Sequence, residues 1–401
     1  MVAGSRAGRA RAAAAGLLLA AAISLPPALL AENPAEHPAE HPADEASAQS
    51  FAWDLPEGFP LPAVPADNPM TAAGVELGRR LFHDPRLSGD GKLACSGCHR
   101  PELAYTDGRA RALGAEGDAH PRSSMSLANV AYVSSLGWDD PTLTRLEDQA
   151  RVPLLNEHPV EMGVAGREAE VLSRFAADRD DRRAFFAAFP GESDPFTLDH
   201  AARALASFQR TLISGDSPYD RWAYGADANA LSPAARDGAR LFFSRRLACF
   251  RCHGGINLSS APRYRRGPET LPTFHNTGLY NVDGQGAYPA PNTGVQRVTG
   301  RAEDMGRFRA PTLRNIALTA PYMHDGSVET LEQVLDHYAR GGRAVEWGDH
   351  TGDGRENPFK DPLIAGFALD ADERETLIAF LHALTDRGFI ERAREMAADA
   401  P

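Results

Sequence analysis

All four cysteines of the chain fall into two short motifs, and each motif ends in a histidine. The motifs are Cys95-Ser96-Gly97-Cys98-His99 and Cys249-Phe250-Arg251-Cys252-His253. In a C-x-x-C-H motif the two thiols bond covalently to a porphyrin, and the histidine becomes the proximal ligand of its iron. Two intervening residues set the thiols about one helical turn apart, which matches the porphyrin edge. The sequence therefore predicts two c-type haems, with His99 and His253 as iron ligands.

Two other uses of paired cysteines remain open at this point. One is a redox dithiol, and the other is a zinc site to which both pairs contribute four thiolates. A dithiol does not need the following histidine, and such a zinc site does not need it twice, so the haem interpretation is favoured. With no cysteine left over, a disulfide framework is not expected.

Length and charge point to a globular protein with about two domains. The 401 residues are 43% hydrophobic, which is enough for real cores, and 42 basic side chains stand against 54 acidic ones. No basic stripe indicates nucleic acid as a partner. An acidic surface favours a basic partner, such as a small basic cytochrome.

The first 31 residues have the pattern of an export signal. Three arginines within the first eleven residues precede an apolar stretch at 12–30, and Ala31 offers a small residue before a cleavage point. The alternative is an uncleaved anchor helix, but Pro26-Pro27 interrupts the apolar stretch. We therefore expect a periplasmic protein with no stable membrane anchor after cleavage, and periplasmic export suits covalent haem attachment.

Composition divides the remaining chain into a linker and two domains. Residues 32–66 form a low-complexity linker whose Pro-Ala-Glu-His repeats contain His37 and His41. These histidines suit a solvated tether better than a metal site. The predicted N-terminal domain spans 67–195, and the C-terminal domain spans 196–395.

The residues before each haem motif look alike. A helix expected at 71–82 contains Gly-Arg-Arg-Leu-Phe at 78–82, and a helix that begins at Ser232-Pro233 contains Gly-Ala-Arg-Leu-Phe at 238–242. Further helices are expected at 198–210 and 370–384, and alternating strand patterns are not evident. We therefore predict a mostly α protein with two cytochrome c-like haem domains, related by internal duplication and joined by long loops.

Six further motifs make residues 77–384 resemble the bacterial dihaem cytochrome c peroxidase and MauG superfamily. They are Leu-Phe-His-Asp-Pro-Arg-Leu-Ser at 81–88, Tyr-Thr-Asp-Gly at 105–108, Leu-Glu-Asp-Gln-Ala at 146–150, Val-Glu-Met-Gly at 160–163, Pro-Thr-Leu-Arg-Asn at 311–315 and Thr-Ala-Pro-Tyr-Met-His-Asp-Gly-Ser at 319–327. The resemblance implies that the first haem reacts with peroxide and that the second transfers electrons.

The resemblance also implies distal groups at the first haem. Glu161 matches the family's distal carboxylate, and Gln149 matches its neighbour, although the interval between them is about two residues longer here. His158, inside that interval, is a second candidate. Trp138 matches the tryptophan that lies between the two haems and passes electrons.

In the classical peroxidases a loop histidine caps the first iron in the resting enzyme. Ala115 occupies that position here. We therefore expect an open, five-coordinate first haem. His120 is the nearest histidine, and it is out of register, so we expect it to be an ordinary loop residue rather than a ligand.

The far ligand of the second iron separates the branches of the superfamily. Classical peroxidases place Met there, whereas this chain has Tyr338, as MauG-like enzymes do. A phenolate stabilises oxidised iron and lowers its potential. Met323 and His324 are nearby alternatives.

The superfamily also holds a calcium ion between its domains. The matching residues are Thr319 and Pro321, through their backbone, and Ser123, which replaces the usual Asn. A serine hydroxyl is a weaker calcium ligand, so calcium is only a secondary expectation.

Taken together, these residues predict a periplasmic dihaem oxidoreductase. It would react with hydrogen peroxide at an open haem and oxidise a partner protein by long-range electron transfer. The residues at 157–161 and 337–342 resemble those of MbnH-type enzymes, which modify a tryptophan of a partner protein. One alternative is a cytochrome c peroxidase that takes electrons from a small cytochrome, and a second is a non-enzymatic dihaem electron carrier.

Overall fold

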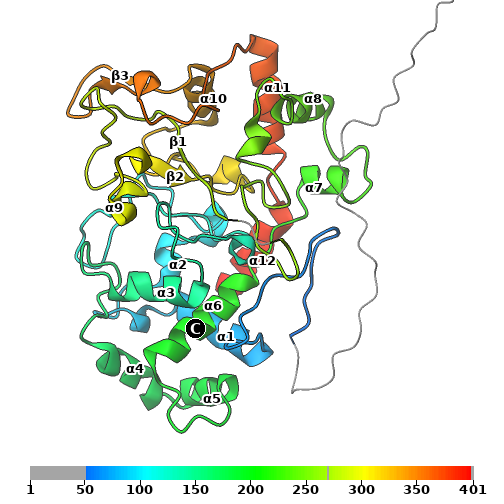
Figure 1. Cartoon of the computed structure of the whole chain (residues 1–401). Helices are drawn as coiled ribbons and strands as arrows, with labels where there is room; N and C mark the ends of the chain where they lie inside the picture. The colour runs from blue at the N-terminus through cyan, green and yellow to red at the C-terminus, as the bar shows by residue number, and fades with distance from the viewer. Residues whose placement is uncertain (1–50, 269–270, 399–401) are drawn as a thin grey trace, which may run out of the picture. The chain divides into compact units, whose positions relative to one another are not determined.

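The computed structural model describes residues 51–268 and 271–398, so the expected signal peptide and residues 32–50 lie outside the described residues. The prediction of a mostly helical chain is confirmed (Figure 1). The helices are α1 (Ala72–His83), α2 (Cys95–Cys98), α3 (Leu146–Leu155), α4 (Glu168–Ala177), α5 (Arg179–Ala188), α6 (Leu198–Arg210), α7 (Pro218–Ala223), α8 (Pro233–Phe242), α9 (Gln296–Thr299), α10 (Leu331–Ala339), α11 (Ala371–His382) and α12 (Arg387–Ala398).

Helix α1 packs across α6 at a glycine. The Thr71 side chain caps α1 by accepting a hydrogen bond from the Gly74 N–H, which satisfies one donor of the first turn. A Cβ added at Gly78 would lie 1.9 Å from the carbonyl oxygen of Ala204 and 2.8 Å from the Phe208 Cβ. Only glycine therefore allows the two helix backbones to approach this closely.

Helix α8 crosses α11 in the same way. Ser232 caps α8 with Pro233 at its first position, as expected from the sequence. A Cβ at Gly238 would lie 1.9 Å from the Thr376 carbonyl oxygen and 2.9 Å from the Phe380 Cβ. The two helix pairs thus share a glycine contact with a carbonyl and an aromatic residue. This likeness supports the predicted internal duplication, which stays a prediction.

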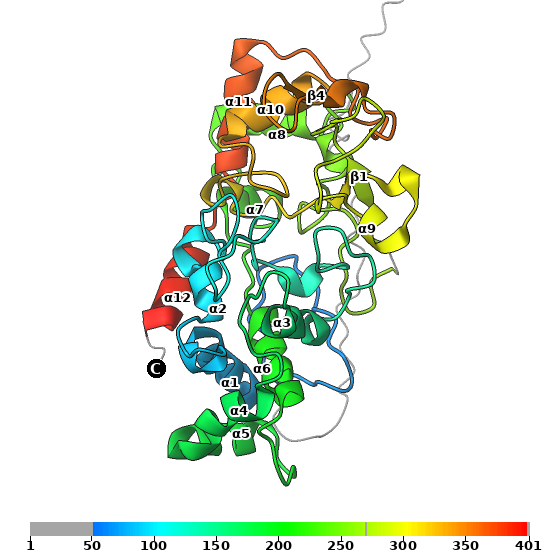
Figure 2. The ribbon, with the colours of Figure 1, turned by 90° about the vertical axis from the view of Figure 1, so that its left-hand side faces the viewer.

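Each helix pair belongs to its own hydrophobic core. The two pairs lie in different halves of the molecule (Figures 1 and 2). Helices α1 and α6 contribute to the first core, and α8, α10 and α11 contribute to the second. Helix α12 follows α11 in sequence but packs in the first core, where the Phe389 and Tyr105 rings lie 5.9 Å apart between centroids. Helices α6 and α12 therefore join the first core although both follow residue 195.

Short strands complete the second half. Strands β1 (Phe274–Asn276) and β2 (Arg307–Arg309) pair antiparallel with Phe274 opposite Arg309, and β3 (Ala344–Val345) pairs antiparallel with β4 (Gly352–Asp353). Strands of two or three residues are too short to display an alternating pattern, which explains why the sequence did not reveal them. Strand β2 matters for the site because it carries Arg309.

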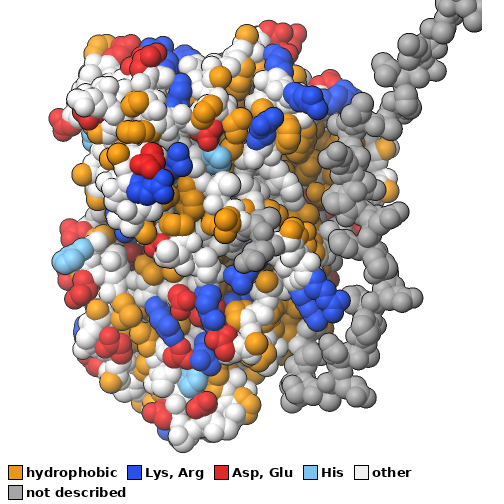
Figure 3. Space-filling view, in the orientation of Figure 1, with side chains coloured by type: hydrophobic (Ala, Val, Ile, Leu, Met, Phe, Trp, Pro, Cys, Tyr) orange, Lys and Arg blue, Asp and Glu red, His pale blue; other side chains and the backbone are white. Residues whose placement is uncertain are grey.

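The described part of the proline-rich segment at 51–66 is irregular but packed. Phe59 is buried beside Tyr132 and Ile213, and the Tyr132 hydroxyl donates a hydrogen bond to the Pro60 carbonyl at 2.8 Å. On the face seen in Figure 3, basic and acidic side chains are interspersed. Among the described residues, no helix combines the length and the apolar character needed to cross a membrane.

Candidate active site

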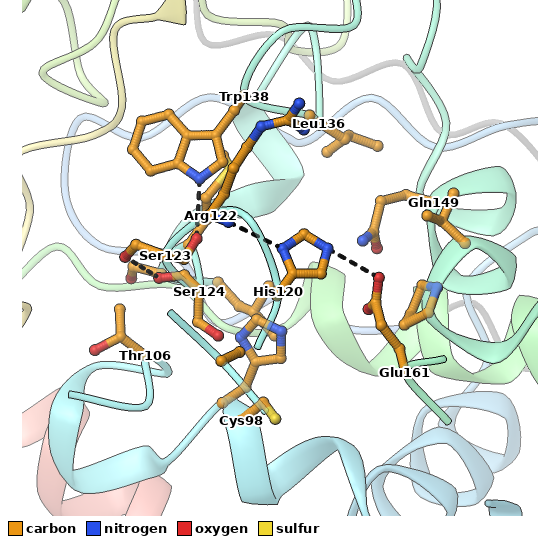
Figure 4. Close-up of a pocket in the computed structure, with 18 of the residues that line it drawn as sticks. Cys98, Thr106, His120, Arg122, Ser123, Ser124, Leu136, Trp138, Gln149 and Glu161 are labelled. Atoms are coloured by element: carbon orange, nitrogen blue, oxygen red, sulfur yellow. Dashed lines mark hydrogen bonds and ion pairs between the residues drawn. The ribbon is translucent and has the colours of Figure 1, made fainter. Parts of the chain in front are cut away.

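The first C-x-x-C-H motif opens into a cavity of about 590 Å³. Helix α2 is the single turn that presents Cys95 and Cys98, and His99 follows it directly. All three residues line the cavity, together with residues from the loops on its other side (Figure 4). The cavity therefore has the three groups that attach and ligate a c-type haem in one wall.

Hydrogen bonding sets the tautomer of both motif histidines. The Nδ1–H of His99 donates to the Tyr105 carbonyl at 2.9 Å, and the Nδ1–H of His253 donates to the Leu258 carbonyl at 3.3 Å. Each ring thus keeps the Nε2 lone pair for a metal, as metal-ligating histidines usually do. Burial lowers the pKa of both rings, to about 4 for His253, which keeps them neutral and able to ligate.

The surroundings of the cysteines argue against the two alternative uses. Burial raises the pKa of all four thiols, to about 12 for Cys95 and to about 11 for Cys249 and Cys252. A redox dithiol needs a lowered thiol pKa, whereas an uncharged thioether suits an apolar site. Over residues 51–268 and 271–398, no group of three His, Cys, Asp or Glu side chains could hold a metal ion, so the four-thiolate zinc site is wrong.

A buried cation in the cavity wall also fits a haem. Arg309 is only 8% exposed, and its side chain donates hydrogen bonds to the neutral Gly137 carbonyl at 3.2 Å and the Met125 sulfur at 3.6 Å. Burial lowers its pKa to about 10. A guanidinium buried without a carboxylate is costly. The two carboxylates of a haem are the chemical groups that would compensate it.

Glu161 reaches the cavity from the segment that follows α3. Its Oε1 accepts a hydrogen bond from the Asn156 amide at 3.0 Å and lies 3.1 Å from the His120 Nε2. Gln149, from α3, lies on the same side of the cavity as Glu161 (Figure 4), and His158 is also among the residues that line the cavity. The structure thus brings the expected carboxylate and amide together on one side of the cavity.

Trp138 connects the first cavity to the second core. Its ring lines the cavity and packs against the second hydrophobic core, and its Nε1–H donates to the Ser123 carbonyl at 3.0 Å. The next residue, Asp139, is 1% exposed and forms ion pairs with Arg122 at 2.7 Å and Arg297 at 3.1 Å. These contacts hold the indole between the two regions that contain the haem motifs.

The second motif has Tyr338 of α10 beside it. Burial, followed by the nearby Cys252 and Cys249 thiols, raises the pKa of the Tyr338 hydroxyl. The other two side chains considered for this role have other surroundings. Met323 lines the first cavity, and the His324 ring stacks on Phe308 with 3.7 Å between the ring centroids. Tyr338 as an iron ligand stays a prediction, and its place beside the cysteines supports it.

Comparison with known proteins agrees with this arrangement. The family model for di-haem cytochrome c peroxidase matches residues 72–228, and a model for RoxA-like, cytochrome c-like proteins matches residues 307–343. The chain is 36% identical to the cytochrome-c peroxidase IdrP1 of Pseudomonas sp. (strain SCT) over 344 residues, which is 81% of this chain and 85% of that protein. It is 35% identical to the methylamine utilization protein MauG of Methylorubrum extorquens over 331 residues, 82% of each chain. The chain belongs to the dihaem cytochrome c peroxidase and MauG family.

A solved structure extends this likeness to the fold. The crystal structure of a MauG-like protein associated with microbial copper homeostasis has 48% sequence identity and a TM-score of 0.82, and it covers 85% of this chain and 97% of that chain. The cytochrome c-like architecture expected from the sequence is thereby confirmed.

Membership in the dihaem cytochrome c peroxidase and MauG family confirms several expectations. The chain is an oxidoreductase, which sets aside the non-enzymatic electron carrier, and it carries two c-type haems.

The structure also places the residues expected to hold calcium. Thr319, Pro321 and Ser123 all line the first cavity, and the Ser123 N–H donates to the His324 carbonyl at 2.9 Å. The expected ligands are carbonyl and hydroxyl oxygens, which suit a hard cation. Calcium in this member of the family stays a prediction.

The sequence did not indicate two contacts of Glu161. His120 is expected from the sequence to be an ordinary loop residue out of register, and Asn156 has no expected role beyond its place in the longer interval. Both side chains contact the Glu161 carboxylate. The longer interval was the available signal for Asn156, whereas His120 reaches Glu161 only through the shape of its loop.

Proposed function

We propose that the chain is a periplasmic, MauG-like dihaem enzyme that uses hydrogen peroxide to oxidise a partner protein. The feature that carries this proposal is Tyr338, which the resemblance to the family matches with the Met of classical peroxidases. Its burial near the Cys252 and Cys249 thiols supports this assignment. A tyrosinate ligand lowers the iron potential. A second haem of low potential accepts electrons poorly from a small cytochrome and is suited to storing an oxidising equivalent.

The first cavity supports the peroxide half of the proposal. Its haem, when bound, would supply the redox chemistry that takes two oxidising equivalents from peroxide. Ala115, where the classical peroxidases have a capping histidine, donates its N–H to the Glu161 carbonyl at 2.9 Å and so lies against the distal segment. Glu161 would accept the peroxide proton and return it to the leaving oxygen.

Trp138 would link the two haems during the reaction. Its indole contacts the first cavity and the second core, so electrons could transfer between the haems in two shorter steps through the ring. The partner protein would supply two electrons, and with two protons the peroxide would become two water molecules. The oxidised partner would not need to enter the cavity, because the electrons would travel through the protein.

A protein substrate is supported by two relatives. One is a methylamine utilization protein MauG, and the other is a MauG-like protein associated with microbial copper homeostasis. The latter likeness, at 48% identity, fits the MbnH-type resemblance of residues 157–161 and 337–342. The exported location rests on the signal pattern of residues 1–31.

The test is to add peroxide to the diferric holoprotein without reductant. We expect a ferric spectrum with one high-spin and one low-spin haem, and then a long-lived oxidised species with near-infrared absorption that decays when the partner protein is added. The second candidate is a cytochrome c peroxidase, which is favoured by the 36% identity to IdrP1. Rapid decay, with fast turnover only when a reduced small cytochrome is present, would establish that candidate instead.

A further inference from the structure

The segment that carries His120 is a hairpin docked onto the Glu161 segment. The Gly114 N–H donates to the Asp118 carbonyl at 3.0 Å, and the His120 N–H donates to the Ala112 carbonyl at 2.7 Å, which closes the hairpin. The Ala115 N–H donates to the backbone of the Glu161 segment. A Cβ at Gly114 would lie 1.9 Å from the Val160 carbonyl oxygen, so the two segments touch without space between them.

The tautomer of His120 follows from its other ring contact. The Arg122 N–H donates to the His120 Nδ1 at 3.3 Å, so Nδ1 is an acceptor. In a neutral imidazole the proton must then lie on Nε2. That nitrogen is 3.1 Å from the Glu161 Oε1 and donates to it (Figure 4). The Nε2 lone pair of His120 is therefore not available to an iron ion while this contact is made.

We propose that His120 is a positioning residue for the distal carboxylate, held in the donating tautomer by the Arg122 N–H. This proposal rests on the proposed role of Glu161. His120 and Asn156 both bond to Oε1, which leaves Oε2 as the oxygen that exchanges a proton with peroxide. Hydrogen bonds to an ionised carboxylate are stronger than those between neutral groups, so the pair fixes the rotation of the carboxylate.

The fixed orientation matters for one proton transfer. With haem and peroxide bound, Oε2 would take a proton from one peroxide oxygen and return it to the other oxygen, which would leave as water with the electron pair of the O–O bond. The haem would supply the two electrons that the remaining oxygen needs. Neither His120 nor Asn156 gains or loses a proton. A carboxylate displaced by about 1 Å can lose about 100-fold in rate.

The experiment compares His120→Ala and His120→Gln in the diferric holoprotein. Each reaction with peroxide is followed by rapid mixing, and each resting ferric spectrum is recorded. We expect His120→Ala to react about 10 to 100-fold more slowly. His120→Gln should react within about threefold of wild type, because its amide N–H replaces the Nε2–H donor. The high-spin fraction should be the same in all three proteins.

Two further variants serve as a control and as a test of whether His120 acts through Glu161. Glu116→Ala changes an exposed side chain on the same hairpin and should react like wild type. His120→Ala combined with Glu161→Gln should be no slower than Glu161→Gln alone, because His120 acts through that carboxylate.

Different failures have different meanings. Multiplying effects in the double variant, or a His120→Gln variant as slow as His120→Ala, would overturn the positioning role. A wild-type protein with two low-spin haems that becomes high-spin in His120→Ala would make His120 an iron ligand instead. Wild-type reactivity of Glu161→Gln would refute the proposed role of Glu161 itself.

Discussion

The indole N–H of Trp138 and the carbonyl of Ser123 form a 3.0 Å hydrogen bond that fixes the ring between the first cavity and the second core. Ser123 is in turn bonded through its N–H to the carbonyl of His324 at 2.9 Å. The orientation of the indole is thus tied to residues from both halves of the chain.

Replacing Trp138 by Phe should separate the two haems kinetically. Phe preserves the apolar contacts but loses the hydrogen bond and the larger ring. We expect the spectral change of the second haem after peroxide addition to become slower by about tenfold or more, which corresponds to about 1.4 kcal/mol of activation free energy. Rapid-mixing spectra resolve the two haems. An unchanged rate at the second haem would remove Trp138 from the electron route.

Replacing Tyr338 by Met should raise the reduction potential of the second haem. Thioether ligation favours ferrous iron, whereas phenolate ligation favours ferric iron. We expect a rise of at least about 59 mV, a tenfold change in the equilibrium constant of a one-electron couple. Spectroelectrochemical titration measures it. An unaltered potential would mean that another group ligates this iron.

Replacing Arg309 by Gln should lower the potential of the haem in the first cavity. Ferric haem carries one positive charge more than ferrous haem, so a buried cation nearby favours the reduced form, and interactions are strong in a low dielectric. Arg309→Lys, which keeps the charge, is the matched control and should shift the potential less. Equal potentials in Arg309→Gln and wild type would place the haem carboxylates elsewhere.

Replacing Gly78 by Ala should destabilise the protein. The added Cβ would lie 1.9 Å from a backbone carbonyl that cannot move without displacing α6, and overpacking typically costs about 1–3 kcal/mol. Gly238→Ala should behave alike, because its Cβ meets the Thr376 carbonyl at the same distance. Gly74→Ala on the same helix should stay within about 1 kcal/mol of wild type. Chemical denaturation compares the three variants.

The pKa of His83 predicts an acid-sensitive contribution to stability. Burial, with a smaller effect of the Arg79 charge, lowers this pKa from 6.5 to about 4. In the unfolded chain His83 therefore binds a proton below about pH 6.5, whereas in the folded chain it binds one only below about pH 4. Stability is full above pH 6.5 and falls as the pH drops toward 4, by roughly 1–2 kcal/mol once partial exposure is allowed for.

The measurement is the free energy of unfolding of wild type and His83→Gln between pH 4 and pH 7. The difference between the two curves isolates His83, because the other acidic groups are common to both proteins. A constant difference across this range would contradict the prediction.

The haem-binding side chains were predictable because they are contiguous. Cys95, Cys98 and His99 need one helical turn and nothing else, so their spacing defines the chemistry. Helices α1 and α8 were predictable for a similar reason, since Thr71 and Ser232 cap them locally. Their partners α6 and α11 were also visible as helices, but which helix crosses which depends on long-range packing.

The contacts between side chains within the site depend on tertiary structure and could not be predicted from the sequence. Glu161 came from a motif, whereas the contact with His120 depends on a hairpin closed by backbone hydrogen bonds that no residue pattern specifies. Arg309 gave no signal either, because its burial depends on a three-residue strand paired with β1. Such features arise from the packing of segments distant in sequence.

Helix α12 has a consequence for how the protein is made. The chain is synthesised from its N-terminus, so the first haem motif precedes all of the second core, yet the Tyr105 ring that follows it gains its partner Phe389 only when α12 has been made. The Asp386 carboxylate, which accepts hydrogen bonds from the Gly215 and Asp216 N–H groups, arrives equally late. The first hydrophobic core is thus begun before the second one and completed after it.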